Sequence, residues 1–92
     1  MTRIVIKKLI WNKYNTAHIK KHGVTVEEVE SIAQDIRVHR RAKKGRYLII
    51  GRVGTRILSA VLSRQDLGIY YPVTARDSDK RERRILYEKE KI

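Results

Sequence analysis

The sequence predicts an α+β protein in which an antiparallel sheet of four to five strands packs against two N-terminal helices and one C-terminal helix. Aliphatic and β-branched residues gather in five short segments, and short turns join the last four of these as hairpins. Between the first segment and the second, apolar residues recur with helical spacing. Hairpins favour antiparallel pairing. The expected order is β-α-α-β-β-β-β-α, in a single domain over residues 1–92.

The first two elements are a strand at residues 4–11 and a helix at residues 12–22. The strand is apolar and β-branched at both ends. The helix is predicted because six side chains fall on one face at helical spacing: Trp11, Tyr14, Asn15, His18, Ile19 and His22.

A sharp corner then leads into a second helix at residues 26–34. Gly23 stands where a helix ends in the left-handed conformation, and Val24 is placed to fold back on Ile19. Thr25 and Glu28 have the spacing of a capping box for the next helix.

The remaining strands are predicted at residues 36–42, 46–53, 55–63 and 69–75. Pro72 cannot donate a ladder hydrogen bond, so the last strand is expected at an edge or with a bulge. Asp79 followed by Glu82 is a second capping box, which begins the final helix.

The charge of the chain indicates a polyanionic partner. Lys and Arg number 22 against ten acidic residues, for a net charge of +12, and residues 36–65 contain no acid. Such an imbalance favours phosphate binding through counterion release. We therefore predict RNA contacts along one basic run: Arg37, Arg40, Arg41, Lys43, Lys44 and Arg46.

Other classes of protein fit the sequence less well. The absence of cysteine excludes disulfides and thiolate metal sites and fits a reducing compartment, so a cytoplasmic location is expected. The sequence has no signal-like or membrane-spanning apolar run. His18 and His22 have metal-ligand spacing, but the glutamate of the zinc hydrolase motif is missing, and a stacked pair is the simpler explanation. We therefore expect no metal and no cofactor.

Arg76 is the candidate for binding a phosphate. It follows a predicted strand and precedes a helix N-terminus, where backbone N–H groups favour an anion. Because the position is at the surface, replacing Arg76 is expected to cost little stability. The alternative is that Arg76 pairs with Glu82 or Asp77 to hold the helix, and its replacement would then lower the melting temperature. Glu82 is either a capping residue or a general base. Tyr87 either covers the sheet, donates a proton or stacks on an RNA base.

Two segments resemble the BrnT family of toxins, which belong to type II toxin–antitoxin systems and have a RelE-like fold. They are "WNKYNTAHIKKHGVTVEEV" near the start and "TARDSDKRERRILY" near the end. Trp11, His22, Glu28, Arg76, Glu82 and Tyr87 match recurrent residues of the family. Asn12 stands where the family usually has an aspartate, and residues 62–71 form a longer segment than is usual.

The resemblance implies a metal-independent endoribonuclease that blocks translation by cutting RNA. Its partner would be a cognate ribbon-helix-helix antitoxin. Operator DNA would be contacted only through that antitoxin. In such an enzyme Arg76 would hold the phosphate, Glu82 or His22 would accept a proton, and Tyr87 would orient the substrate.

Two alternatives stay open on the sequence. The same charge suits a non-catalytic nucleic-acid-binding module, because no complete acid–base pair is evident. It also suits an interaction domain whose basic face binds an acidic protein.

Overall fold

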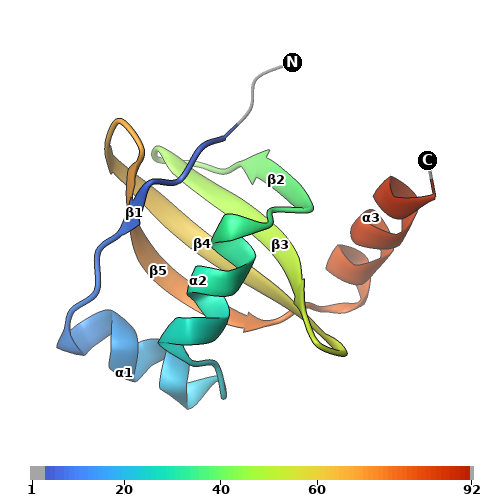
Figure 1. Ribbon diagram of the computed structural model, residues 1–92, viewed down its shortest axis with the longest axis horizontal. Helices are drawn as coiled ribbons and strands as arrows, with labels where there is room; N and C mark the ends of the chain where they lie inside the picture. Colours follow the sequence, from blue (N-terminus) through green and yellow to red (C-terminus); the bar gives the residue numbers. More distant parts are fainter. Residues whose placement is uncertain (1–3, 92) are drawn as a thin grey trace.

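The computed structural model describes residues 4–91 and has the predicted order of elements (Figure 1). The first half contains β1 (Lys8–Leu9), α1 (Lys13–Lys21), α2 (Val26–Gln34) and β2 (Val38–Arg41). The second half contains β3 (Arg46–Val53), β4 (Arg56–Asp66), β5 (Ile69–Asp77) and α3 (Lys80–Glu90). Within the described residues, no helix is both long and apolar enough to cross a membrane.

The five strands form one mixed sheet in the order β1-β5-β4-β3-β2. Strands β2 to β5 pair antiparallel, as predicted. β1 departs from the prediction because it pairs parallel with β5. Two helices lie between β1 and the hairpins. A connection of that length allows β1 to pair with a hairpin strand in either a parallel or an antiparallel direction.

β1 is also much shorter than the strand predicted at residues 4–11. The amide of Ile10 donates to Tyr70 of β5, at 2.9 Å. Pro72 follows on β5 and has no N–H with which to continue the ladder. The carbonyl of Ile10 instead accepts a hydrogen bond from Asn15 Nδ2, at 2.9 Å. The chain therefore leaves the sheet and turns into α1.

Pro72 lies at a bulge, as the sequence predicted. The register between β4 and β5 shifts between Val61 and Leu62, and Leu62 pairs with Pro72. Beyond this point β5 continues to Asp77, two residues past the predicted end. The extension places Arg76 inside the strand, opposite Ser59.

The local signals at the helix ends are confirmed. The amide of Val24 donates to the carbonyl of Ile19 and that of Gly23 to Lys20, with Gly23 at φ +72°. These bonds end α1 in the predicted corner. The Thr25 and Asp79 capping boxes are both formed.

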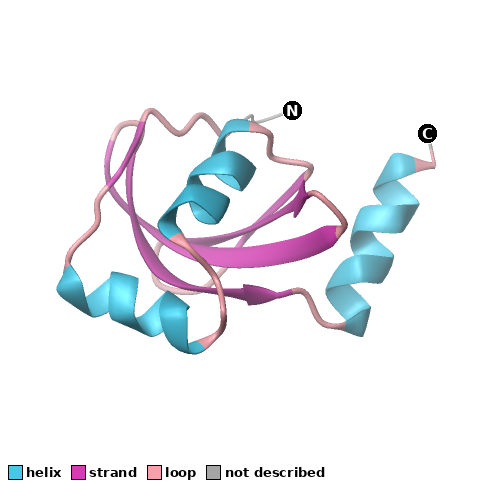
Figure 2. Ribbon diagram, turned by 60° about the horizontal axis from the view of Figure 1, so that its bottom comes forward, coloured by secondary structure: helices cyan, strands magenta, loops and turns pink. Residues whose placement is uncertain are grey.

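Two apolar clusters lie on opposite faces of the sheet. The larger one packs α1 and α2 against Ile49, Leu58 and Ala75, and the smaller one packs Leu86 of α3 against Ile50. Gly51 permits the close approach of α2, because an added Cβ would lie 2.8 Å from Ile32 Cβ. Figure 2 shows α3 beyond one end of the sheet, well away from α1.

Candidate active site

The arginine at the end of β5 is held by a buried carboxylate. Arg76 Nη1 and Nη2 donate to Glu82 Oε1 and Oε2 at 2.7 and 2.9 Å, so the pair is bidentate. Glu82 is only 8% exposed, whereas the Arg76 side chain is 41% exposed. Nη1 also donates to the Asp77 carbonyl, at 3.2 Å. A ligand would therefore contact the exposed part of a side chain whose terminal nitrogens already bond Glu82.

Glu82 accepts further hydrogen bonds from the elements around it. The backbone N–H of Asp79 and the hydroxyl of Ser59 each donate to Oε1, both at 3.0 Å. Burial alone would raise the pKa of Glu82, but the hydrogen bonds from Arg76, Asp79 and Ser59 outweigh it, and the pKa is lowered. A carboxylate held ionised in this way is poorly matched to a proton-accepting role near neutral pH.

Because of this network, replacing Arg76 should destabilise the fold more than the sequence predicted. The sequence predicted a surface position and little loss of stability, with pairing to Glu82 or Asp77 as the alternative, and the structure shows the pairing with Glu82. In the structure, its removal takes two charged hydrogen bonds from a buried carboxylate, which costs more than an ordinary surface change. Arg76 and Glu82 are six residues apart, and the extended end of β5 brings them together.

The sheet next to Arg76 is open on the α3 side. Residues paired across the strands point to the same face. One such row contains Val38, Ile50 and Ser59, all buried, and ends at Arg76. The adjacent row is exposed or half-buried throughout and consists of Arg40, Leu48, Val61 and Thr74. Arg76 therefore lies at the corner between α3 and an accessible strip of sheet, which we call the open row.

His22 does not join Arg76. It is exposed at the end of α1, and its ring contacts His18 at 5.2 Å between centroids. α1 packs against the face that contains Leu58, whereas Arg76 pairs with Ser59 on the opposite face.

Tyr87 is also at a distance from the Arg76–Glu82 pair. It is half exposed on α3, and the guanidinium of Arg52 lies 5.8 Å from its ring centre. Arg52 itself makes a bidentate pair with Glu90, at 2.8 Å for both bonds. Of the four predicted catalytic residues, the structure therefore brings together Arg76 and Glu82.

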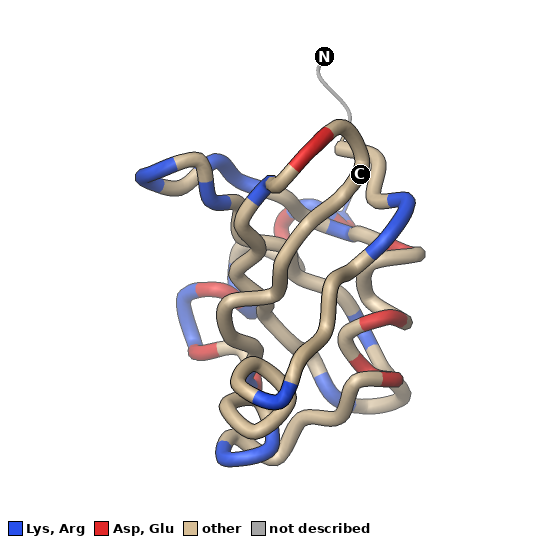
Figure 3. Tube along the Cα trace, turned by 90° about the vertical axis from the view of Figure 1, so that its left-hand side faces the viewer, with Lys and Arg blue, Asp and Glu red and all other residues tan. Residues whose placement is uncertain are grey.

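The predicted basic run does not form one face. Arg40 and Arg41 are neighbours on a strand and point to opposite faces of the sheet. Arg37 is paired with Asp35 at 3.0 Å and with Glu90 at 3.4 Å. Arg46 shares the open side with Arg40, and Lys43 and Lys44 are exposed in the hairpin turn between them. Figure 3 shows basic positions distributed over much of the trace.

Arg56 has a structural role that the sequence did not indicate. It donates to Glu28 at 2.8 Å, to the Gly23 carbonyl at 3.2 Å, and to both carboxylate oxygens of Asp77. It thereby ties the corner between α1 and α2 to the end of β5. Its partners are 21 or more residues away, so no local pattern could have indicated them.

Among residues 4–91, no three His, Asp or Glu side chains come close enough to form a candidate metal site. His18 and His22 form a ring pair, as expected, but the rings meet edge to face at an interplanar angle of 66° and are not stacked.

The comparisons with known proteins agree with this architecture. No family model and no curated protein matches the chain. Among solved structures, the crystal structure of BrnT, a ribonuclease toxin from Brucella abortus, is similar with a TM-score of 0.62 and 18% sequence identity. The match covers 79% of this chain and 97% of that one. The chain therefore has a BrnT-like fold, as the sequence resemblance implied.

Proposed function

We propose that the protein is an endoribonuclease toxin of a type II toxin–antitoxin system, with Arg76 as its phosphate-binding residue. The observation that carries the proposal is the Arg76–Glu82 pair, set on a BrnT-like fold beside the open row of the sheet. The guanidinium of Arg76 is held by the Glu82 carboxylate, and the side chain is 41% exposed. Such preorganisation is what stabilisation of a developing charge requires.

Cleavage by this route needs few protein groups. The 2′-hydroxyl of RNA attacks the adjacent phosphorus, the bond to the 5′-oxygen breaks, and a 2′,3′-cyclic phosphate and a 5′-hydroxyl result. The proton of the 2′-hydroxyl passes to a base, and the departing 5′-oxygen takes up a proton. Arg76 would stabilise the pentacoordinate phosphate, and Glu82 would position Arg76 rather than accept the proton.

A non-catalytic RNA-binding module is the second candidate. It is favoured by the same hydrogen-bond network, because Glu82 is engaged by Arg76, Ser59 and Asp79 and has a lowered pKa. Neither His22 nor Tyr87, the other two predicted catalytic residues, makes a hydrogen bond to the pair; His22 contacts His18, and Tyr87 contacts Arg52. The two candidates differ in whether RNA is cut or only bound.

Induced expression tests the proposal at the level of the cell. The chain expressed alone should stop growth and degrade RNA, and coexpression of an adjacent ribbon-helix-helix gene should restore growth. The antitoxin would cover the positive surface with acidic residues, so the two proteins should associate faster at low salt. If the purified pair cut RNA as fast as the free chain, blocking of the RNA site would be wrong.

The open side of the β2–β3 hairpin should contribute RNA affinity without sequence preference. Replacing Arg40, Lys43, Lys44 and Arg46 with Gln should weaken binding to all RNA sequences. The slope of log K against log salt is negative, and it should become less negative by about 3, since each of the four lost contacts with single-stranded RNA contributes roughly 0.7. Arg37→Gln is the control, because Arg37 is paired with Asp35 and Glu90. An unchanged slope in the fourfold variant would show that this side does not touch phosphate.

Cleavage should survive removal of divalent metals. The reaction uses a nucleophile that RNA itself supplies, the sequence has no cysteine, and no three His, Asp or Glu side chains of residues 4–91 come together as a metal site. The cleavage rate in excess EDTA should therefore equal the rate in untreated buffer. Loss of cleavage in EDTA and its recovery with zinc or manganese would contradict this.

A further inference from the structure

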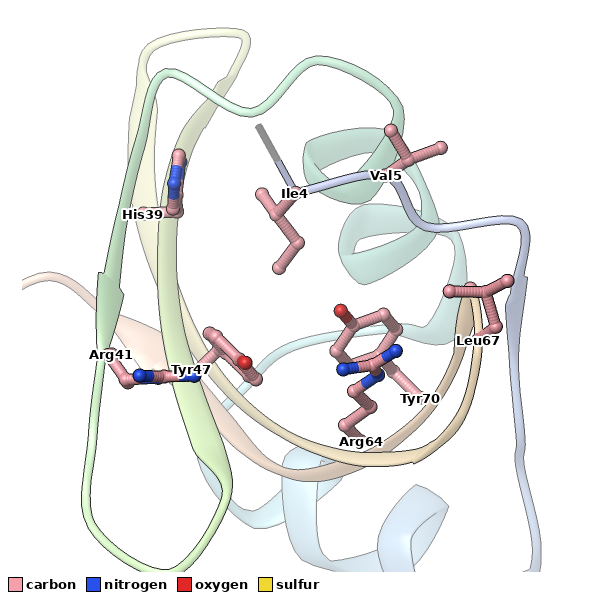
Figure 4. Close-up of a pocket in the computed structure, with 9 residues that line it drawn as sticks. Ile4, Val5, His39, Arg41, Tyr47, Arg64, Leu67 and Tyr70 are labelled. Carbon is pink, nitrogen blue, oxygen red and sulfur yellow. The ribbon is translucent and has the colours of Figure 1, made fainter. Parts of the chain in front are cut away.

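A cleft lies on the sheet face that carries α1 and α2, opposite the open row (Figure 4). Its volume is about 600 Å³, within the usual range for small-ligand sites. The N-terminal segment at Ile4 and Val5, strands β2 and β3, and the loop at Leu67 enclose it. None of the residues proposed for RNA cleavage lines it.

Two arginines enter this cleft from different strands. Arg41 comes from β2 and Arg64 from β4, and no acidic residue lines the cleft. Neither arginine forms an ion pair with any residue in 4–91, whereas Arg56 and Arg76 are both paired with carboxylates. Two unpaired guanidinium groups without a nearby acid favour a ligand with several anionic oxygens.

Tyr70 adds a hydroxyl that faces the same space. The residue is 5% exposed, and its ring meets that of Tyr47 edge to face, with centroids 5.9 Å apart. Within the described chain its hydroxyl makes no hydrogen bond, and Figure 4 shows it directed into the cleft. No fully buried polar side-chain atom of the described residues lacks a partner, so this unpaired hydroxyl is open to the cleft and free to donate to a ligand. Burial also raises the pKa of Tyr70, so the phenol stays protonated and able to donate.

The rest of the cleft is apolar. Leu67 and Val5 are 73% and 56% exposed at its rim, and the side chain of Ile4 points toward the two tyrosines (Figure 4). Exposed aliphatic side chains beside aromatic rings suit a flat ligand with apolar faces. The cleft thus combines an anion-binding side with an aromatic and aliphatic side.

We propose that this cleft binds one nucleoside phosphate, either free or as a unit of an RNA chain. Arg41 and Arg64 hold the phosphate, the Tyr70 hydroxyl donates a hydrogen bond to it, and the base lies against Tyr47 and the apolar rim. A phosphate offers three oxygens to the two arginine forks, whereas a carboxylate of an acidic peptide offers two. Since the cleft is on the other face from Arg76, binding here requires no cleavage, and the two proposals can fail separately.

Titration of the ¹⁵N-labelled full chain with the four nucleoside 5′-monophosphates tests this site. Amides of Tyr47, Gly68 and Tyr70 should shift and saturate. Arg41→Gln/Arg64→Gln should weaken binding tenfold or more, since it removes both forks. Arg81→Gln/Arg84→Gln is the matched control: it removes the same charge from exposed positions of α3, and affinity should change less than twofold.

Tyr70→Phe isolates the hydroxyl. Because this group makes no hydrogen bond within the described chain, the melting temperature should be unchanged while nucleotide affinity falls roughly threefold to tenfold. A short oligodeoxynucleotide, which lacks the 2′-hydroxyl and is not cut, distinguishes the sources. Shifts at the same amides would identify the ligand as a nucleic-acid strand, and shifts with mononucleotides alone would identify a free nucleotide.

Three results would overturn the proposal. One is the absence of saturable shifts up to about 10 mM nucleotide. Another is equal weakening by the two double variants, which would mean that net charge alone attracts the ligand. The third is binding of inorganic phosphate, or of an acidic peptide, as tight as that of any nucleotide, because the aromatic and apolar side would then play no part.

Discussion

Arg76→Ala should lower the rate of RNA cleavage by about a hundredfold or more, the loss typical when a donor to a transition-state oxyanion is removed. It should also destabilise the fold by about 1–3 kcal/mol, because Glu82 loses two charged hydrogen bonds in a buried position. In a domain of this size each kcal/mol corresponds to a shift of about 4–8 °C in Tm. Cleavage should therefore be measured at a temperature where circular dichroism shows both proteins folded.

Arg56→Ala separates the loss of cleavage rate from the loss of stability. It is the same substitution at an arginine that is likewise held by carboxylates, here Glu28 and Asp77, so a loss of stability is expected, smaller than for Arg76→Ala because Asp77 is exposed. Arg56 lies outside the Arg76–Glu82 pair, and cleavage by the folded variant should be close to normal. Arg76→Lys restores the charge without the fork and should recover only part of the rate. A destabilised Arg76→Ala that cuts RNA at the normal rate would reduce Arg76 to a structural residue.

Glu82→Gln should destabilise the protein at pH 7 and should flatten its response to acid. An amide offers one oxygen to a network that uses both carboxylate oxygens, so a loss of about 1–3 kcal/mol is expected. The folded-state pKa of Glu82 is lowered from 4.5. Its stabilising contribution is therefore fully present above pH 4.5 and is lost as pH falls through the lower folded-state value.

Urea unfolding at pH 7 and at pH 3 measures this difference. The gap between the wild type and Glu82→Gln should be largest at pH 7 and should shrink in acid. Glu88→Gln, an exposed change on the same helix, should give no gap at either pH. A gap that is constant from pH 7 to pH 3 would show that ionisation of Glu82 does not stabilise the fold. Because Glu82 positions Arg76 and does not itself contact the phosphate, Glu82→Gln should lower the cleavage rate less than Arg76→Ala does.

The parts of the fold that the sequence predicted well depend on neighbouring residues. The corner at Gly23 and the capping boxes at Thr25 and Asp79 are formed by bonds within five residues, so local spacing was sufficient. The parallel pairing of β1 depends on where α1 and α2 return the chain, which local spacing does not determine.

The candidate site shows the same division. Arg76 and Glu82 were both identified, but their direct pairing depends on β5 continuing two residues past its predicted end. The period-2 alternation of a strand should have separated Arg40 from Arg41, and treating the run as one face ignored it. Arg56 could not be found in the sequence, because its role depends on three segments that meet only in the folded chain.

The most direct test of the account is an assay of RNA cleavage by the purified protein in EDTA, with mass spectrometry of the product ends. We predict fragments that carry a 2′,3′-cyclic phosphate and a 5′-hydroxyl, formed by the wild type and by Arg56→Ala but about a hundredfold more slowly, or not at all, by Arg76→Ala. RNA that is bound by the folded wild type and yet remains uncut would contradict the account and would support a non-catalytic RNA-binding module.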